Sequence, residues 1–372
     1  MKKLKINTIT CHDVYNFGAS LQAYALMKYL EDLGHEVQII DYKSDYLSYN
    51  IWTIGAKWDK NIMMKFIYYC YVIPKRIGMK KRRERFDQFT SEQLNLTAQS
   101  YSTFSNLEDN PPIADVYFAG SDQIWNPLLP NGKDRSFYLD FVPADKVRAS
   151  YAASFSVNEI AEELQPFVKT MLAKLDFISV RETSGVELVR SLGFEDVKAV
   201  FDPVYLLAKN TWEQLSLAPK IKDKYIFVYD QENNALLKET AVYLAKKYKF
   251  KIVAIEALYP LRYADIRIKD AGPREFLGLI ENCEICLTNS FHCISFSLIF
   301  NKNFYLFKRT HLKVNSRMID LLHNLGLSNR IIESFDGKWK IEEIEYREVN
   351  NKVEIGRTSS YKYIQRVLES VK

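Results

Sequence analysis

The sequence has no long apolar stretch and few cysteines, and each absence excludes a class of protein. Its most apolar run, residues 62–74, is interrupted by Lys65 and falls short of the roughly 20 residues that span a bilayer. Five cysteines in 372 residues do not make the disulfide framework of a small secreted protein. Residues 1–10 lack the apolar segment of a signal peptide. We therefore expect a cytoplasmic protein that does not cross a membrane.

Glycine, proline and net charge are also low. Thirteen glycines and 11 prolines exclude a collagen-like or low-complexity chain. The 51 basic and 46 acidic residues leave a formal charge of +5, too little over this length to indicate a nucleic-acid partner. Hydrophobic residues make up 47% of the chain, enough for a large core. Because 372 residues exceed the size at which one core stops growing, we expect about two domains.

Common nucleotide-binding and metal-binding motifs are missing. Neither G-x-G-x-x-G nor the P-loop pattern occurs, so dinucleotide binding and P-loop phosphoryl transfer lose their main support. Cys283-x-x-Cys286 is followed by His292-Cys293 but has no second paired motif, and Cys286 lies in an apolar stretch where thiols usually pack. We expect no metal site.

What is present is an alternation of strand and helix patterns. A strand pattern at residues 5–10 is followed by helical apolar spacing from Leu21 to Leu33, which Gly34 ends, and by a second strand pattern at 37–41. Further strands are expected at residues 115–120, 148–153, 177–181 and 197–201. Apolar strands that alternate with helices indicate a parallel sheet covered on both faces.

A polar segment, residues 208–224, separates this series from a second one and is the predicted linker. The second series has strands expected at residues 225–229, 251–255, 284–288 and 304–307. The sequence therefore predicts an α/β protein of two doubly wound domains. Their expected bounds are 1–207, with a basic and aromatic insert at about 43–110, and 225–355, followed by a helix at 359–372 that returns to the first domain.

Polar residues that follow the expected strands are the candidate site, because ligands of open parallel sheets bind beyond the carboxyl ends of the strands. They are Asn16, Gly18, Asp122, Gln123, Ser154 and Arg181 in the first domain and Asn289, Ser290, His292 and Arg317 in the second. Structural alternatives exist: Asn16 can cap a helix, Asp122 can bind turn amides and Arg181 can pair with Glu182. His292 is the most informative, because imidazole titrates near neutral pH and this one lies at a helix start.

Seven basic residues lie between Lys75 and Arg85, directly after the apolar run. Apolar residues beside clustered lysine and arginine suit an anionic bilayer, so peripheral contact with the inner membrane face is one interpretation. A solvated helix face is the equal alternative. Nucleic acid is disfavoured, because the basic patch is confined to one segment.

Short motifs at the candidate loops occur in one order from residue 15 to residue 292. They are Y-N-F-G-A-S-L-Q from Tyr15, G-S-D-Q-I-W-N from Gly120, Y-A-A-S-F from Tyr151, S-V-R-E from Ser179, Asp202-Pro203, G-P-R-E-F-L from Gly272 and T-N-S-F-H from Thr288. This ordered set, which Ser316-Arg317 extends, resembles the polysaccharide pyruvyl transferase family.

The resemblance implies a GT-B-like fold in which two Rossmann-like domains face a cleft. It implies transfer of pyruvate from phosphoenolpyruvate to a sugar of a bacterial cell-surface or exopolysaccharide repeat unit, as a cyclic ketal. Phosphoenolpyruvate is then the co-substrate and no cofactor is needed. The partner is a saccharide acceptor, with a lipid-linked form as one interpretation.

Ketal formation needs a proton for the enol methylene, a base for the sugar hydroxyl, and cations for the carboxylate and phosphate. With the resemblance, His292 and Asp122 are the predicted catalytic residues. Arg181 suits the donor carboxylate as a bidentate ligand. Asn289, Ser290 and Arg317 complete the expected donor site, and the expected acceptor or cleft residues are Asn16, Gly18, Gln123 and Ser154.

One position departs from the family pattern. Family members often carry an arginine two residues before the histidine, where this chain has Ser290, and Arg317 is the predicted substitute cation. Two alternatives remain open: a GT-B glycosyltransferase that uses a sugar nucleotide, and a non-catalytic relative that binds sugar or sugar phosphate.

Overall fold

The first half of the chain folds around a five-stranded parallel sheet with strand order β3-β2-β1-β4-β5. The computed structural model describes residues 2–47, 61–72, 79–256, 260–310 and 315–371. The strands are β1 (Lys5–Ile9), β2 (Glu36–Tyr42), β3 (Leu96–Tyr101), β4 (Val116–Ala119) and β5 (Val147–Ser150). Single bridges at Ala149 and Ala153 continue this sheet towards the pair β6 (Ile178–Val180) and β7 (Val197–Ala199).

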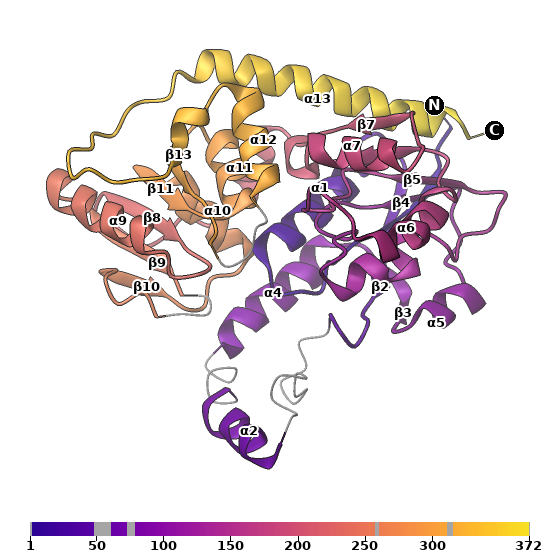
Figure 1. Ribbon diagram of the computed structural model, residues 1–372, viewed down its shortest axis with the longest axis horizontal. Coiled ribbons are helices and arrows are strands. Elements are labelled where there is room, and N and C mark those ends of the chain that lie inside the picture. The colour runs from indigo at the N-terminus through magenta and orange to yellow at the C-terminus, as the bar shows by residue number, and fades with distance from the viewer. Residues whose placement is uncertain (1, 48–60, 73–78, 257–259, 311–314, 372) are drawn as a thin grey trace.

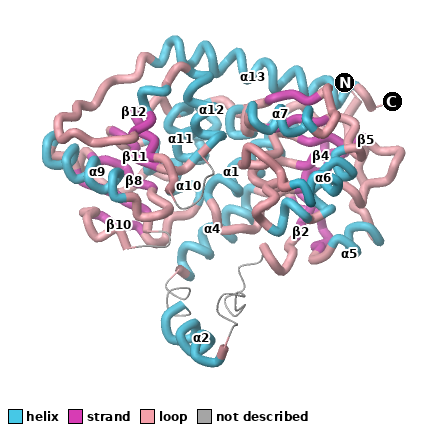
Figure 2. Tube along the Cα trace, viewed as in Figure 1, coloured by secondary structure: helices cyan, strands magenta, loops and turns pink. Residues whose placement is uncertain are grey.

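Both faces of this sheet are buried, as its apolar strands predict. Alternate residues of β4 point to opposite faces: Val116 and Phe118 join one hydrophobic cluster, whereas Tyr117 and Ala119 join another. Helices pack around the strands in Figure 2. The helices and helical turns of this half are α1 (Phe17–Asp32), α2 (Ile62–Ile67), the π-helical turn η1 (Tyr68–Val72), α4 (Lys80–Gln93), α5 (Phe104–Asp109), the 3-10 turns η2 (Pro130–Lys133), η3 (Arg135–Tyr138) and η4 (Glu162–Leu164), α6 (Gln165–Leu172), α7 (Thr183–Ser191) and the 3-10 turn η5 (Pro203–Tyr205). Of these, α2 and η1 lie apart from the sheet (Figure 1).

The second half forms a six-stranded parallel sheet with strand order β10-β9-β8-β11-β12-β13. The strands are β8 (Tyr225–Tyr229), β9 (Lys251–Ile255), β10 (Ile266–Ile268), β11 (Ile285–Thr288), β12 (Asn303–Phe307) and β13 (Ile331–Ile332). The helices of this half are α8 (Lys209–Leu215), α9 (Ala235–Tyr248), α10 (Pro273–Glu281), α11 (Phe291–Ile299), α12 (Ser316–Leu325), the 3-10 turn η6 (Ser328–Arg330) and α13 (Tyr346–Glu369). The predicted class, two Rossmann-like α/β units, is confirmed.

In each sheet the strand order reverses once. The reversal lies between β1 and β4 in the first sheet and between β8 and β11 in the second. Crevices form at such switch points, because the connections on either side run to opposite faces of the sheet. The loops after these four strands are therefore the expected binding loops.

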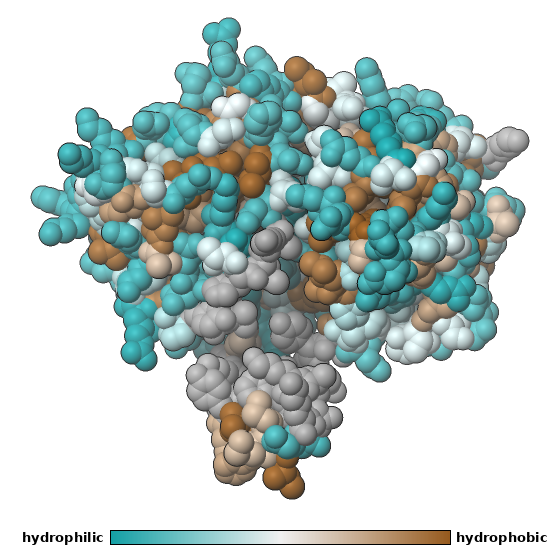
Figure 3. Space-filling view, in the orientation of Figure 1, coloured by the Kyte–Doolittle hydropathy of each residue, from teal (hydrophilic) through white to brown (hydrophobic). Residues whose placement is uncertain are grey.

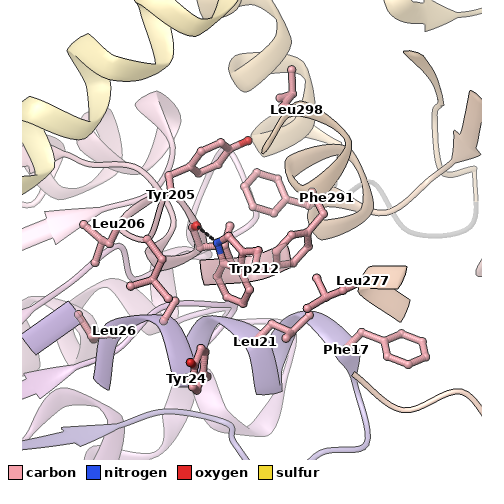
Figure 4. Packing of buried hydrophobic residues seen from close by; sticks show 14 of the residues in the cluster. Phe17, Leu21, Tyr24, Leu26, Tyr205, Leu206, Trp212, Leu277, Phe291 and Leu298 are labelled. Atoms are coloured by element: carbon pink, nitrogen blue, oxygen red, sulfur yellow. Dashed lines mark hydrogen bonds between the residues drawn. The ribbon is translucent and has the colours of Figure 1, made fainter. Parts of the chain in front are cut away.

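The two halves share one hydrophobic core. The ring of Phe17 on α1 stacks on Phe276 of α10, with centroids 4.5 Å apart. Trp212 on α8 is fully buried, and its Nε1 donates a hydrogen bond to Val204 O at 3.1 Å. Figure 4 shows this region, in which side chains of both halves interdigitate. The shared core fixes how the two sheets face each other.

The last helix, α13, runs along one side of both halves (Figure 1). Tyr363 OH donates to Ser150 O at 2.8 Å, and Tyr361 OH donates to Leu206 O at 3.0 Å. The helix begins at Tyr346 rather than at residue 359, because Val349 is already buried on its inner face.

Two segments differ from the sequence-based prediction. The expected insert at 43–110 is partly sheet: α4 buries Phe86 and Phe89, and β3 adds the edge strand beside β2. The expected linker at 208–224 contains α8, which packs against α10. In the described segments, no helix combines the length and apolarity needed to cross a bilayer.

Candidate active site

A cavity of about 280 Å³ lies between the two halves, at the carboxyl ends of the switch-point strands. α1 follows β1, and α11 follows β11, so the first turns of both helices meet at its wall. Both halves supply its lining: Tyr15, Asn16, Met79, Arg82, Arg83, Asp122, Gln123, Tyr229, Gln231, Ser290, Phe291, His292, Arg309 and Arg317.

Positive charge dominates this cavity. Its lining includes four arginines: Arg82 and Arg83 from α4, Arg309 after β12, and Arg317 at the start of α12. Asp122 is the one carboxylate among the described lining residues. Guanidinium groups present planar forks of donors that match carboxylate and phosphate oxygens. The cavity is therefore suited to a ligand that carries several negative charges.

Arg317 is buried in the wall between the halves. Its Nη1 donates to Ser156 Oγ at 3.2 Å and lies 3.8 Å from Asp122 Oδ1. With the Gln123 amide turned so that its oxygen faces Arg317, that oxygen accepts from Nη1 and Nη2 at 3.1 and 3.2 Å. Burial, and then the charge of Arg181, lowers the pKa of Arg317 to about 10. The guanidinium therefore keeps its charge at neutral pH.

His292 lies in the first turn of α11, and its ring is fixed from two sides. Its Nε2 lies 3.4 Å from Asp202 Oδ2, which comes from the other half of the chain. A Cβ added to Gly18 would lie 1.9 Å from His292 Nδ1, so only glycine leaves room for the imidazole there. The ring is buried but lines the cavity. An imidazole ring held in one position at the cavity wall is suited to proton transfer at that position.

Asp122 has a strained backbone. Its φ is 71°, in the left-handed region that an aspartate seldom adopts, and its carbonyl accepts from Ser154 N at 3.0 Å. Side chains held this way cluster at functional sites. The strain places the carboxylate at the cavity wall, with Oδ1 3.6 Å from Arg181 Nη2.

Arg181 belongs to a buried ion network behind Phe291. Its Nη1 donates to Asp202 Oδ2 at 2.6 Å, and its guanidinium carbon lies 4.6 Å from the centre of the Phe291 ring. Glu182 Oε2 lies 3.9 Å from Arg181 Nε. Burial alone would raise the pKa of Asp202, but its contacts with His292 and Arg181 hold it well below the usual value. Asp202 is therefore ionised beside Arg181 at neutral pH.

Three predicted ligands lie off the cavity wall. Arg181 donates a hydrogen bond to Asp202 and does not line this cavity, so its predicted role on the donor carboxylate stays a prediction. Asn289 uses its side chain to join β8 and β11: Nδ2 donates to Asp230 Oδ1 at 2.7 Å and Oδ1 accepts from Gln231 N at 2.9 Å. Ser154 Oγ donates to Glu182 Oε1 at 2.8 Å and is fully buried. These side chains hold the loops in place.

The other predicted residues come together. His292, Asp122, Ser290, Arg317, Asn16 and Gln123 all line the cavity. Asn16 also caps α1, because its Oδ1 accepts from Gly18 N at 2.9 Å, so the structural interpretation is confirmed and the role in ligand binding stays a prediction. Gly18 lies behind the His292 ring. Arg317, the predicted substitute cation, is in the cleft.

Sequence reasoning missed Arg309 and misread Arg82 and Arg83. The basic stretch that contains them is predicted to face either a membrane or solvent, but Arg82 is buried with its guanidinium carbon 4.7 Å from the centre of the Phe17 ring, and both arginines line the cavity. Arg85 pairs with Asp270 and Glu275 of the second half. The sequence did contain a signal that Arg82 faces inwards. Arg82, Phe86 and Phe89 recur at helical spacing and share the inner face of α4.

The described segments contain no group of three His, Cys, Asp or Glu side chains placed to hold a metal ion. Cys286 Sγ lies 3.3 Å from Cys293 Sγ inside the core. Burial, and then the contact with Cys293, raises the pKa of the Cys286 thiol well above its usual value. These cysteines pack as small apolar side chains.

Comparisons with known proteins agree with this geometry. A UDP-N-acetylglucosamine 2-epimerase is similar to the chain with a TM-score of 0.55 and 9% identity, over 99% of this chain and 96% of that one. The UDP-GlcNAc 2-epimerase of Methanocaldococcus jannaschii has a TM-score of 0.51 and 14% identity, over 99% of both chains. That of Neisseria meningitidis, bound to UDP-GlcNAc, has a TM-score of 0.50 and 12% identity, over 98% and 100%. These likenesses show a GT-B fold.

No curated protein is significantly similar to the chain in sequence. A family model described as polysaccharide pyruvyl transferase matches residues 16–311, which include the cavity residues from Asn16 to Arg309.

Proposed function

The chain belongs to the polysaccharide pyruvyl transferase family, and from this premise we propose that it transfers pyruvate from phosphoenolpyruvate to a saccharide as a cyclic ketal. The charge of the cavity carries the proposal. Phosphoenolpyruvate bears a carboxylate and a phosphate, and the described lining offers Arg82, Arg83, Arg309 and Arg317 against Asp122 alone. A neutral sugar by itself would not need four arginines.

Ketal formation begins with protonation of the donor. We assign His292 to give a proton to the methylene carbon of phosphoenolpyruvate, which makes the neighbouring carbon, C2, electron-poor. A sugar hydroxyl then forms a bond to C2, and Asp122 accepts its proton. Asp202 acts as a positioning residue, because it lies 3.4 Å from His292 Nε2 and orients the ring.

Phosphate leaves in the second step. A second hydroxyl of the same sugar bonds to C2, while the bond from C2 to the phosphate oxygen breaks and its electron pair leaves with the phosphate. The hydroxyl proton goes to the departing phosphate, so the products are the cyclic ketal and inorganic phosphate. Arg309 and Arg317 stabilise the negative charge on the leaving group, together with the unpaired amides at the start of α11.

The direct test is release of inorganic phosphate from phosphoenolpyruvate in the presence of saccharide acceptors. His292→Ala should lower turnover by about 100-fold or more, because a positioned acid or base contributes that much. His323→Ala is the matched control, since His323 is exposed on α12. Full activity in the His292 variant would remove this residue from the mechanism.

Binding measurements on the same protein preparation distinguish two alternative functions. The cation-rich cavity would also accommodate the diphosphate of a sugar nucleotide, and the fold neighbours named above include an enzyme bound to UDP-GlcNAc. Binding of UDP-GlcNAc, with no binding of phosphoenolpyruvate, would favour that donor. Binding of phosphoenolpyruvate without multiple turnovers on any acceptor would favour a non-catalytic relative.

A further inference from the structure

The helix α2 and the turn η1 carry exposed apolar side chains. Ile62 is 88% exposed, Phe66 is 69% exposed, and Met63, Ile67 and Tyr69 are also exposed. Figure 1 places this segment at one extremity of the molecule, apart from both sheets, and Figure 3 shows apolar surface at its end. Isolated apolar residues on a surface are ordinary, but a cluster of them marks an interaction site.

Lysines lie on the same side of the molecule, at the start of α4. The Lys80 side chain is 79% exposed and forms only a long pair with Glu84, at 3.7 Å between Nζ and Oε1. Lys81 is exposed as well. Two further basic residues of this stretch, Lys75 and Arg76, lie outside the described residues.

The next residues of α4 belong to the active site. Arg82 and Arg83 follow the two lysines directly and line the cavity, as Met79 does before them. The start of α4 therefore connects the exposed lysines to the cavity wall. A molecule held by its apolar part near α2 could extend an anionic part towards Arg82 and Arg83.

From this arrangement we propose that α2, η1 and the lysines of α4 form a docking surface for an anionic lipid bilayer. The apolar side chains insert into the boundary of the acyl chains, and Lys80 and Lys81 contact anionic headgroups. The mixed character favours this occupant, because one bilayer surface offers an acyl boundary to the apolar side chains and anionic headgroups to the lysines. For the proposed function, docking gives the enzyme access to an acceptor carried on a lipid.

The test is co-sedimentation of the full chain with vesicles of phosphatidylcholine containing 0, 20 or 40% phosphatidylglycerol. Ile62→Ser/Phe66→Ser should abolish sedimentation. The matched control is Ile113→Ser/Leu128→Ser, which removes two side chains that are 84% and 70% exposed elsewhere on the surface. That control should bind like the wild type.

Lys80→Ser/Lys81→Ser tests the electrostatic part and leaves the cavity arginines intact. Each lysine near an anionic surface contributes roughly fivefold in affinity, so a loss of about 30-fold is expected at low salt and less at high salt. Lys220→Ser/Lys222→Ser, which removes two other exposed lysines, should have no such effect.

Docking is measured without donor or acceptor, so its outcome is independent of pyruvyl transfer. Equal binding by the wild type and the Ile62/Phe66 variant would overturn the proposal, as would no binding at any lipid composition. A wild-type dimer in solution that the Ile62/Phe66 variant loses, without vesicle binding, would assign the surface to a second copy of the chain and also overturn it.

Discussion

Two neighbouring groups of charged residues, which share Asp122, differ in their balance of charge. In the first group, Arg181 faces Asp202, Asp122 and Glu182 within 4 Å. In the second group, the cavity lining combines four arginines with Asp122. Carboxylates outnumber arginine in the first group, and arginines outnumber the carboxylate in the second.

This difference indicates what each arginine does. A buried arginine whose carboxylate partners outnumber it fixes the conformation of its loops, and it adds no surplus positive charge that would attract an anion. A surplus of buried or half-buried arginine disfavours the empty site and favours an anion. Sequence position alone did not separate these cases, because Arg181 and Arg317 each follow a strand in a motif.

The largest expected effect is on stability, from the Arg181 group. Arg181→Met should lower the free energy of unfolding by about 3–5 kcal/mol, because it leaves buried carboxylates without their cation. Arg366→Met is the control, since Arg366 pairs with Asp196 at the surface, where such pairs contribute about 1 kcal/mol or less. Urea unfolding of the two variants measures the difference. Similar losses would show that the network does not hold the fold.

The second effect is on ligand affinity, from the surplus group. Arg309→Met should weaken phosphoenolpyruvate binding by about 10- to 100-fold, because a hydrogen bond to a charged group contributes about 1.5–3 kcal/mol. Its stability should change little, in contrast to Arg181→Met. Isothermal titration calorimetry checks the affinity. An unchanged dissociation constant would place the donor elsewhere in the cleft.

The third effect concerns the contact that fixes His292. Gly18→Ala would put a methyl group 1.9 Å from Nδ1 and displace the ring, so we expect turnover to fall about 10-fold or more. Alanine favours a helix over glycine, which offsets part of any loss in stability. Gly185→Ala is the control, because its nearest neighbour would be 3.2 Å away, at Val180. Retained turnover in Gly18→Ala would mean that the ring position is not critical.

The smallest effect is on pH dependence. The pKa of Asp202 is held below its usual value in the folded protein, so its ionised form contributes stability above pH 4 that is lost as the pH falls. Asp202→Asn should therefore flatten the acid limb of the stability curve, by at most about 1.4 kcal/mol per pH unit. Asp196→Asn should flatten it less, because solvent screens that exposed pair. Identical acid limbs for wild type and Asp202→Asn would contradict the assignment.

The sequence by itself determined the alternation of strands and helices. Apolar runs such as Tyr225–Tyr229 specify buried parallel strands, and β8 has the bounds that the sequence predicts. The ordered motifs also contain most of the residues that line the cavity. The reason is that the carboxyl ends of strands at a switch point lie close together, whatever the conformation of the loops. The short strands β10 and β13 were missed, since two or three residues give too little periodicity to detect.

Only the tertiary structure decided which polar residues face the cavity. Arg181 and Asn289 belong to motifs, but their side chains form hydrogen bonds with other residues of the chain. Arg82 belongs to a basic stretch, but it lines the cavity. The reason is that a side chain's partner comes from distant segments: Asp202 for Arg181, Asp230 for Asn289, and Phe17 for Arg82. Local sequence sets where a residue lies on its strand or helix, but packing between the two halves sets what it touches.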